Sequence, residues 1–113
     1  MGSRVLLTSS LKDVMALSEL VIPSVALQSE MMMPHPKVIA LLKRKFEKVF
    51  VLYDNDFDKK ENPGQTMALK ICDRYGIENI RIPDKYQSKD PSDLIHSHGP
   101  IVAYNLLHGR NHD

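Results

Sequence analysis

The chain has 113 residues, of which 42% are hydrophobic and 26% charged, and its net charge is +1. This length fits one domain with a single hydrophobic core, and the balanced charge gives no global field that would attract nucleic acid or a membrane. Cys72 is the single cysteine, which excludes an intrachain disulfide and favours a cytoplasmic setting. No apolar run approaches the roughly 20 residues of a membrane span, so we expect no membrane partner.

Strands and helices are predicted to alternate along the first half of the chain. Residues 4–8 form a short strand, and apolar residues with helical spacing predict a helix over residues 11–20 that packs on the sheet. A second, very short strand covers residues 24–27. Pro36 then sits at the first turn of the next helix, a position that proline favours.

Two features around this second helix have two interpretations each. The loop before it contains Met31, Met32 and Met33. Three exposed methionines would be unusual, so at least one is expected to fill a gap in the core, and a partner-binding surface is the alternative. The basic residues between positions 37 and 48 are typical of a solvated helix face, and contact with nucleic-acid phosphates is the alternative.

The middle of the chain is predicted to contain a buried strand and a helix. Residues 49–53 form a continuous apolar run, typical of a strand that is buried on both faces. Residues 57–64 read as a charged loop, in which Pro63-Gly64 marks a turn. An apolar stripe from Met67 to Tyr75 predicts a helix that ends at Gly76 in a C-cap position.

The last part of the chain repeats the alternation. Residues 79–83 are predicted to be a fourth strand, and residues 84–89 a polar loop. Asp90 is placed at the N-cap of another helix, where an aspartate can accept a hydrogen bond from a free backbone N–H. A last short helix covers residues 100–108, and residues 109–113 are expected to be a frayed tail.

Four strands with helices between them predict a three-layer α/β/α sandwich around a four-stranded parallel sheet. The first and third strands are the most apolar, so they should lie side by side in the centre. The expected strand order is 2-1-3-4, with the switch point between strands 1 and 3. We expect residues 1–113 to form one domain, with its core between about residues 4 and 99.

Asp54 and Asp56 follow directly on the most apolar strand. Ligand sites of open α/β sheets lie beyond the carboxyl ends of the strands. Two neighbouring carboxylates there suit a hard divalent cation such as Mg²⁺ or Mn²⁺, which prefers oxygen ligands and often shares them with substrate phosphates. The alternative is a strand that stops here because Asp-Asn-Asp is a good turn former. The loop over residues 8–13 would face this acidic pair.

Three segments carry a resemblance to a known family. These are residues 7–17 with Asp13, residues 51–56 with the Asp54-x-Asp56 pair and the downstream Pro63-Gly64, and residues 89–94 with Lys-Asp-Pro. Together, residues 4–99 resemble a Toprim domain, the catalytic module of DNA primases, type IA and type II topoisomerases and some nucleases. The third segment is most similar to the primases of phages, prophages and bacteria.

The resemblance implies a site and an activity. Asp54, Asp56 and Asp90 would bind the metal, Asp13 would be a further acid of the catalytic centre, and Lys12 and Lys89 would meet substrate phosphates. The implied function is nucleotidyl transfer with Mg²⁺ or Mn²⁺, for RNA primer synthesis in DNA replication. The implied partners are a single-stranded DNA template and nucleotides, and in addition a helicase or other replication proteins.

Ser9 departs from the pattern, because it stands where the family has its catalytic Glu, and Ser10 stands where the family has Gly. A serine hydroxyl is uncharged, binds Mg²⁺ weakly and does not accept a proton near neutral pH. Two alternatives therefore stay open: a degenerate, non-catalytic Toprim module that binds metal, nucleic acid or a replication partner, and a Toprim-type nuclease or topoisomerase-like nicking activity. Glu30 is a better placed substitute for the missing Glu than Glu19, which lies on a helix.

Overall fold

The computed structural model describes residues 3–27 and 31–108. Its strands form one parallel sheet in the order β2-β1-β3-β4. The bounds of these strands are Arg4–Thr8 for β1, Ser24–Ala26 for β2, Lys48–Val51 for β3 and Glu78–Asn79 for β4. The predicted order 2-1-3-4, with β1 and β3 in the centre, is therefore confirmed.

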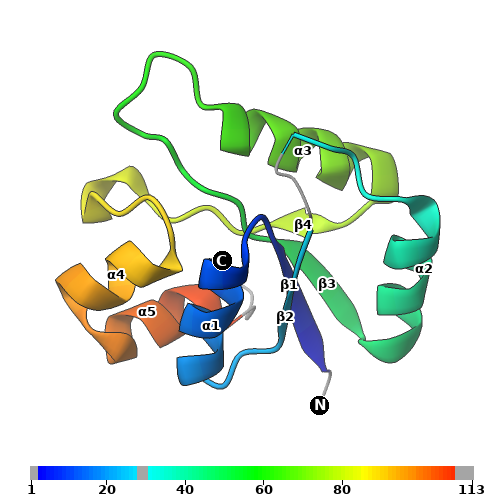
Figure 1. The fold of residues 1–113 in the computed structure, drawn as a ribbon, viewed down its shortest axis with the longest axis horizontal. Coiled ribbons are helices and arrows are strands. Elements are labelled where there is room, and N and C mark those ends of the chain that lie inside the picture. The colour runs from blue at the N-terminus through cyan, green and yellow to red at the C-terminus, as the bar shows by residue number, and fades with distance from the viewer. Residues whose placement is uncertain (1–2, 28–30, 109–113) are drawn as a thin grey trace.

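Helices cover both faces of this sheet (Figure 1). Their bounds are Leu11–Glu19 for α1, Pro36–Lys45 for α2, Pro63–Tyr75 for α3, Pro91–His98 for α4 and Pro100–Leu107 for α5, with a short 3₁₀ turn, η1, at Asp84–Tyr86. Helices α1, α4 and α5 pack on one face, and α2 and α3 on the other. The result is the predicted three-layer sandwich.

The two central strands divide their side chains between two cores. In β1, Leu6 points to the core under α1, α4 and α5, whereas Val5 and Leu7 point to the core under α2 and α3. Side chains of any strand alternate between the two faces of the sheet, and here helices cover both faces. This explains why the central parts of both strands, residues 5–7 and 49–51, are continuous apolar runs.

Local signals in the sequence set the helix ends. The side chains of Ser10, Asn62 and Asp90 accept hydrogen bonds from backbone N–H groups in the first turns of α1, α3 and α4, as N-cap residues do. Gly76 ends α3 with φ +64°, in the left-handed region that glycine adopts without strain. The predicted N-cap at Asp90 and C-cap at Gly76 are both confirmed.

The predicted fourth strand is wrong in its bounds. Strand pairing stops at Asn79. One more ladder hydrogen bond runs from the Ile80 N–H to the Val51 carbonyl at 2.8 Å, and the segment after Ile80 then leaves the sheet. The carbonyl of Ile82 instead accepts a hydrogen bond from the Asn55 side chain at 2.7 Å. A side-chain bond has thus replaced the strand ladder that the pattern of residues 79–83 predicts.

Two further differences concern Pro63-Gly64 and the extent of the core. Pro63-Gly64 lies inside the first turn of α3, not in a turn before it. Helix α5 contributes Ala103 and Leu107 to the core, which therefore extends beyond residue 99. At least one of the three methionines was expected to fill a gap in the core. Met33 is partly buried and packs against the core, whereas Met31 and Met32 are exposed. The predicted tail at 109–113 lies outside the described residues.

Within the described part of the chain, no helix combines the length and the apolar character that crossing a bilayer requires.

Candidate metal centre

Three carboxylates from distant parts of the chain meet at one edge of the sheet. Asp13 lies in the first turn of α1, Asp54 follows the buried run that begins in β3, and Asp90 caps α4. One carboxylate oxygen from each of them lies within 4.8 Å of the others. Asp13 and Asp90 are almost fully buried, with 1% and 4% of their surface exposed. Such spacing lets one cation bind oxygens of all three residues.

The turn between β1 and α1 positions Asp13. The hydroxyl of Ser10 accepts a hydrogen bond from the Asp13 N–H at 3.3 Å, and Ser10 has an extended backbone with φ −151°. The hydroxyl of Thr8 donates to the Val25 carbonyl at 3.2 Å and so fastens the end of β1 to β2. The backbone at Ser10 is therefore extended and needs no glycine.

Asp90 has a partner on each carboxylate oxygen. Its Oδ1 accepts from the Asp93 N–H at 2.9 Å, which caps α4, and its Oδ2 lies 3.1 Å from the Nζ of Lys12. The hydrogen bond from Lys12 to Asp90, together with the charge of Asp90, raises the pKa of Lys12 above its ordinary value. An ammonium group thus already neutralises part of the acidic centre.

Gln65 holds the backbone that carries Asp54. This buried side chain, 4% exposed, donates to the carbonyls of Tyr53 and Asp54 at 3.1 and 3.2 Å, and its oxygen accepts from the Asn79 amide at 3.0 Å. The amide therefore links α3 to the chain just after β3 and to the end of β4. It fixes the backbone position from which the Asp54 side chain extends.

Asn55, the residue between the two acids, joins three other segments. Its backbone N–H donates to the Lys89 carbonyl at 2.8 Å. Its side-chain amide donates to the Ile82 carbonyl at 2.7 Å and to Asp84 Oδ1 at 2.8 Å, and its oxygen accepts from Asn62 at 2.6 Å. The bond from the Asn55 N–H to the Lys89 carbonyl fixes the segment before Asp90 against the segment that carries Asp54.

Asp84 belongs to the same network on the outer side. Hydrogen bonds from Asn55 and from Arg81, and the charge of Arg81, hold the pKa of Asp84 below its ordinary value. Asp84 is therefore ionised at neutral pH and acts as an acceptor for both neighbours.

Asp56 does not join the three-acid group. Its side chain is buried, and Oδ1 lies 3.7 Å from the Nζ atoms of both Lys59 and Lys89. Its backbone N–H donates to Asn62 Oδ1 at 2.9 Å. The sequence predicted Asp56 beside Asp54 as a shared ligand. Residues 52–56 lie outside the strand, so the strict alternation of side chains does not hold there, and the bond to Asn62 sets the backbone at Asp56. In the structure Asp56 is the counter-ion of two lysines.

The donor set suits a hard divalent cation. The three-acid centre offers only carboxylate oxygens, which Mg²⁺ and Mn²⁺ accept and which softer, thiolate-binding metals do not prefer. Three like charges this close repel one another, and a cation would relieve that repulsion. Asp13, Asp54 and Asp90 could therefore hold one metal ion. Lys12, Lys59 and Lys89 are exposed around it and leave positive charge for an anionic ligand.

Two of the residues considered in the sequence analysis, Ser9 and Glu30, are not part of the three-acid group. Ser9 lies in the turn between β1 and α1 and is partly buried. Glu30 falls outside the described residues. Sequence reasoning missed Asn55, Asn62 and Gln65 as supports of the centre. Gln65 was detectable, because it precedes Ala68 and Ile71 on the buried face of α3 at helical spacing, and a buried amide needs polar partners.

No family model matches the chain, and neither the curated proteins nor the solved structures contain a match to it.

Proposed function

We propose that the chain is a Toprim-like module that uses Mg²⁺ or Mn²⁺ to act on the phosphates of nucleotides, as in the primer synthesis of DNA primases. One observation carries this proposal: the oxygens of Asp13, Asp54 and Asp90 lie within 4.8 Å of one another at one sheet edge. These acids come from the three segments on which the resemblance rests. The strands before Asp13 and Asp54, β1 and β3, are neighbours in the sheet, and Asp90 reaches the same edge as the N-cap of α4.

The lysines around the centre support a phosphate-bearing ligand. Lys12 lies against Asp90, and Lys59 and Lys89 both lie against Asp56. Each ammonium is exposed at its tip while its carboxylate partner is buried. The acids thus hold positive charge at the rim of the centre, where it can attract phosphates.

In this proposal the residues have distinct roles. When bound, the cation neutralises phosphate charge and favours attack on phosphorus. Asp13, Asp54 and Asp90 supply its oxygen ligands, and Lys12 and Lys89 orient the triphosphate. The 3′-hydroxyl of one nucleotide attacks the α-phosphorus of the next, the bond to pyrophosphate breaks, and the hydroxyl proton passes to water because Ser9 supplies no base.

A second candidate function follows from Ser9. A site that binds a cation and phosphates but lacks the family's Glu fits a non-catalytic module that holds metal, nucleic acid or a replication partner. Ser9 is partly buried in the tight turn before α1, so no charged group from this position can serve as acid or base. The two candidate functions share the metal centre and differ only in whether the module joins nucleotides.

Calorimetric titration with Mn²⁺ tests the shared centre. Wild-type protein should bind Mn²⁺, and Asp13→Asn, Asp54→Asn and Asp90→Asn should each abolish the binding heat. Asp90→Asn is the sharpest variant, because asparagine caps a helix as well as aspartate does and so preserves α4. Asp56→Asn is the matched control and should retain binding. Equal heats for wild type and the three variants would remove the centre.

Activity assays then separate the two candidates. Purified protein is given single-stranded DNA, ribonucleotides and Mg²⁺ or Mn²⁺, and oligoribonucleotide products are resolved on a gel; nicking of supercoiled DNA is measured in parallel. Primer synthesis that is lost in Asp54→Asn supports the primase-type function. Silence in both assays with intact metal binding selects the non-catalytic module, and activity gained by Ser9→Glu would show that the missing Glu alone silences the site.

A further inference from the structure

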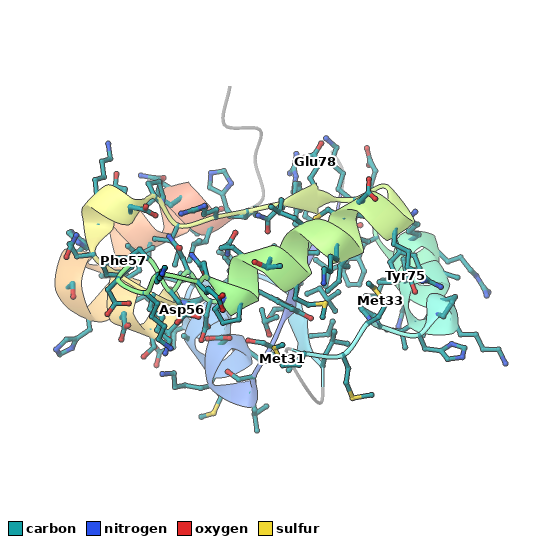
Figure 2. The ribbon with its side chains drawn as sticks, turned by 90° about the horizontal axis from the view of Figure 1, so that it is seen from above. Met31, Met33, Asp56, Phe57, Tyr75 and Glu78 are labelled. Carbon is teal, nitrogen blue, oxygen red and sulfur yellow. The ribbon has the colours of Figure 1, made fainter. Side chains whose placement is uncertain are left out.

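A cavity of about 550 Å³ lies between Met31 and α3. Pro63, Thr66, Met67 and Lys70 line it from one face of α3, since they are spaced three and four residues apart. Figure 2 shows Met31 beside the N-terminal half of this helix, with Asp56 at the same end.

The lining combines apolar and basic groups. Met31, which is 63% exposed, and Met67 bring thioethers to the cavity, and Lys60 and Lys70 bring ammonium groups. Thioether sulfur makes favourable contacts with aromatic rings, and a flexible methionine adapts to rings of different shape. Lysine ammonium groups bind phosphate as point charges. Glu61 is the carboxylate of this lining, so the local charge favours an anion.

The cavity is continuous with the loop that carries the acids. Asn62 lines it, and the same side chain donates to Asn55 and accepts from the backbone N–H of Asp56. Lys60 follows Lys59, whose ammonium lies against Asp56. The cavity therefore borders the loop that follows Asp54, and its volume is within the size range of small-molecule sites.

We propose that this cavity binds one nucleotide unit of the ligand, with the base between Met31 and Met67 and its phosphate near Lys60 and Lys70. The inference rests on the proposed phosphate-binding function and names its substrate class more closely. A free nucleotide and a nucleotide within a strand share this chemistry, so the experiment uses both.

Methionine oxidation tests the position of the base. The protein is treated with dilute hydrogen peroxide in Mg²⁺ buffer, alone, with ATP, or with oligothymidylate, and sulfoxide is measured residue by residue by mass spectrometry. Ligand should slow oxidation of Met31 and Met67 at least about threefold, because a stacked base covers the sulfur. Met15 on α1, 65% exposed, is the matched control and should oxidise at an unchanged rate.

The two ligands separate the sources. Protection by ATP and by the oligonucleotide assigns a general nucleotide site, and protection by one of them alone assigns that ligand. If fluorescence anisotropy shows bound oligonucleotide while Met31 oxidises as in the free protein, or if Met15 is protected equally, the cavity is not the base site.

Charge reversal provides a second measurement. Lys60→Glu and Lys70→Glu should each weaken oligonucleotide binding about five- to tenfold, since each places a negative charge beside a phosphate. Lys45→Glu, on the exposed face of α2, is the control and should change affinity less than about twofold. Mn²⁺ binding should stay intact in all three. If the wild-type protein does not bind Mn²⁺, the proposed metal function is wrong. If it binds both Mn²⁺ and the oligonucleotide but the Lys60 and Lys70 variants bind the oligonucleotide as tightly as wild type, only the proposed role of the cavity is wrong.

Discussion

The Nζ of Lys12 lies 3.1 Å from Oδ2 of Asp90, a carboxylate that also belongs to the three-acid group. Lys12 therefore competes with a cation for the same charge. Lys12→Met should strengthen Mn²⁺ binding about two- to fivefold, the range expected when an exposed ammonium is removed from a carboxylate. The same variant should weaken binding of a phosphate ligand. Calorimetry with Mn²⁺ and anisotropy with an oligonucleotide measure the two affinities.

The opposite signs make this prediction specific. Lys45→Met removes an exposed ammonium from α2 and should change neither affinity by more than about twofold, since screening weakens distant surface charges. A decrease of both affinities in Lys12→Met would mean that Lys12 supports the fold of the centre, and the competition would then be excluded.

Gln65 is predicted to act on the metal centre through Asp54 without touching the cation. Gln65→Met keeps the length of the side chain and removes both hydrogen bonds to the Tyr53 and Asp54 carbonyls. We expect a loss of about 1–3 kcal/mol in the free energy of unfolding, because buried acceptors lose their donors. At a temperature where the variant is fully folded, its Mn²⁺ affinity should also fall.

Gln87→Met is the matched control, since Gln87 is exposed beyond η1. Urea unfolding and Mn²⁺ calorimetry of both variants separate the roles. If Gln65→Met loses stability but binds Mn²⁺ like wild type, Gln65 supports the fold and does not position Asp54.

Cys72 is predicted to be an unreactive thiol. Burial, with a further contribution from the charge of Glu78, raises the pKa of Cys72 to about 11. Since the thiolate is the reactive form, only about a thousandth of the thiol is reactive at pH 8. Modification by an aromatic disulfide reagent should be slow in buffer and fast in urea, and absorbance of the released thiol measures both rates.

The raised pKa of Cys72 also sets the direction in which pH changes the stability of the protein. The unfolded chain loses the Cys72 proton near its ordinary pKa of 9.0, before the folded chain does. Stability from this group is therefore present below pH 9 and falls as the pH rises from 9 towards 11. Cys72→Ala should lack this part of the decline, and an identical alkaline decline in both proteins would contradict the assignment.

Val21 is predicted to be a strained residue at the surface. It has φ +59° and is 86% exposed, in the turn between α1 and β2. A β-branched residue is unfavourable there, whereas asparagine tolerates this conformation. Val21→Asn should raise stability by about 1 kcal/mol, or about 4 °C in Tm. Val38→Asn, within α2, should lower it; a lower Tm for Val21→Asn would mean that the valine makes contacts worth more than the strain.

Much of the fold was predictable, because binary pattern and caps act locally. The continuous apolar runs at β1 and β3 predicted two central strands, and the order 2-1-3-4 followed. Asp90 and Gly76 marked helix ends through the geometry of their own residues. The fourth strand failed because Asn55 binds the Ile82 carbonyl, a contact between residues far apart in sequence that no local pattern contains.

The candidate centre was predictable in part for the same reason. Asp54 and the loop that leads to Asp13 follow two neighbouring strands, and a parallel sheet brings strand ends together. Asp90 was expected at the site only from the Toprim resemblance, because it caps α4 and follows no strand directly. Asp56 differs, because the direction of one side chain within a loop depends on what binds its backbone, here the Asn62 amide. The Toprim-type activity and the role of Ser9 remain proposals for the assays above.

The position of Asp90 late in the chain has a consequence for biosynthesis. A ribosome releases Asp13 and Asp54 well before Asp90, and β1 must wait for β3 before the sheet has a centre. Contacts of such long sequence separation form slowly. A nascent chain should thus lack the complete three-acid group until Asp90 and α4 have emerged.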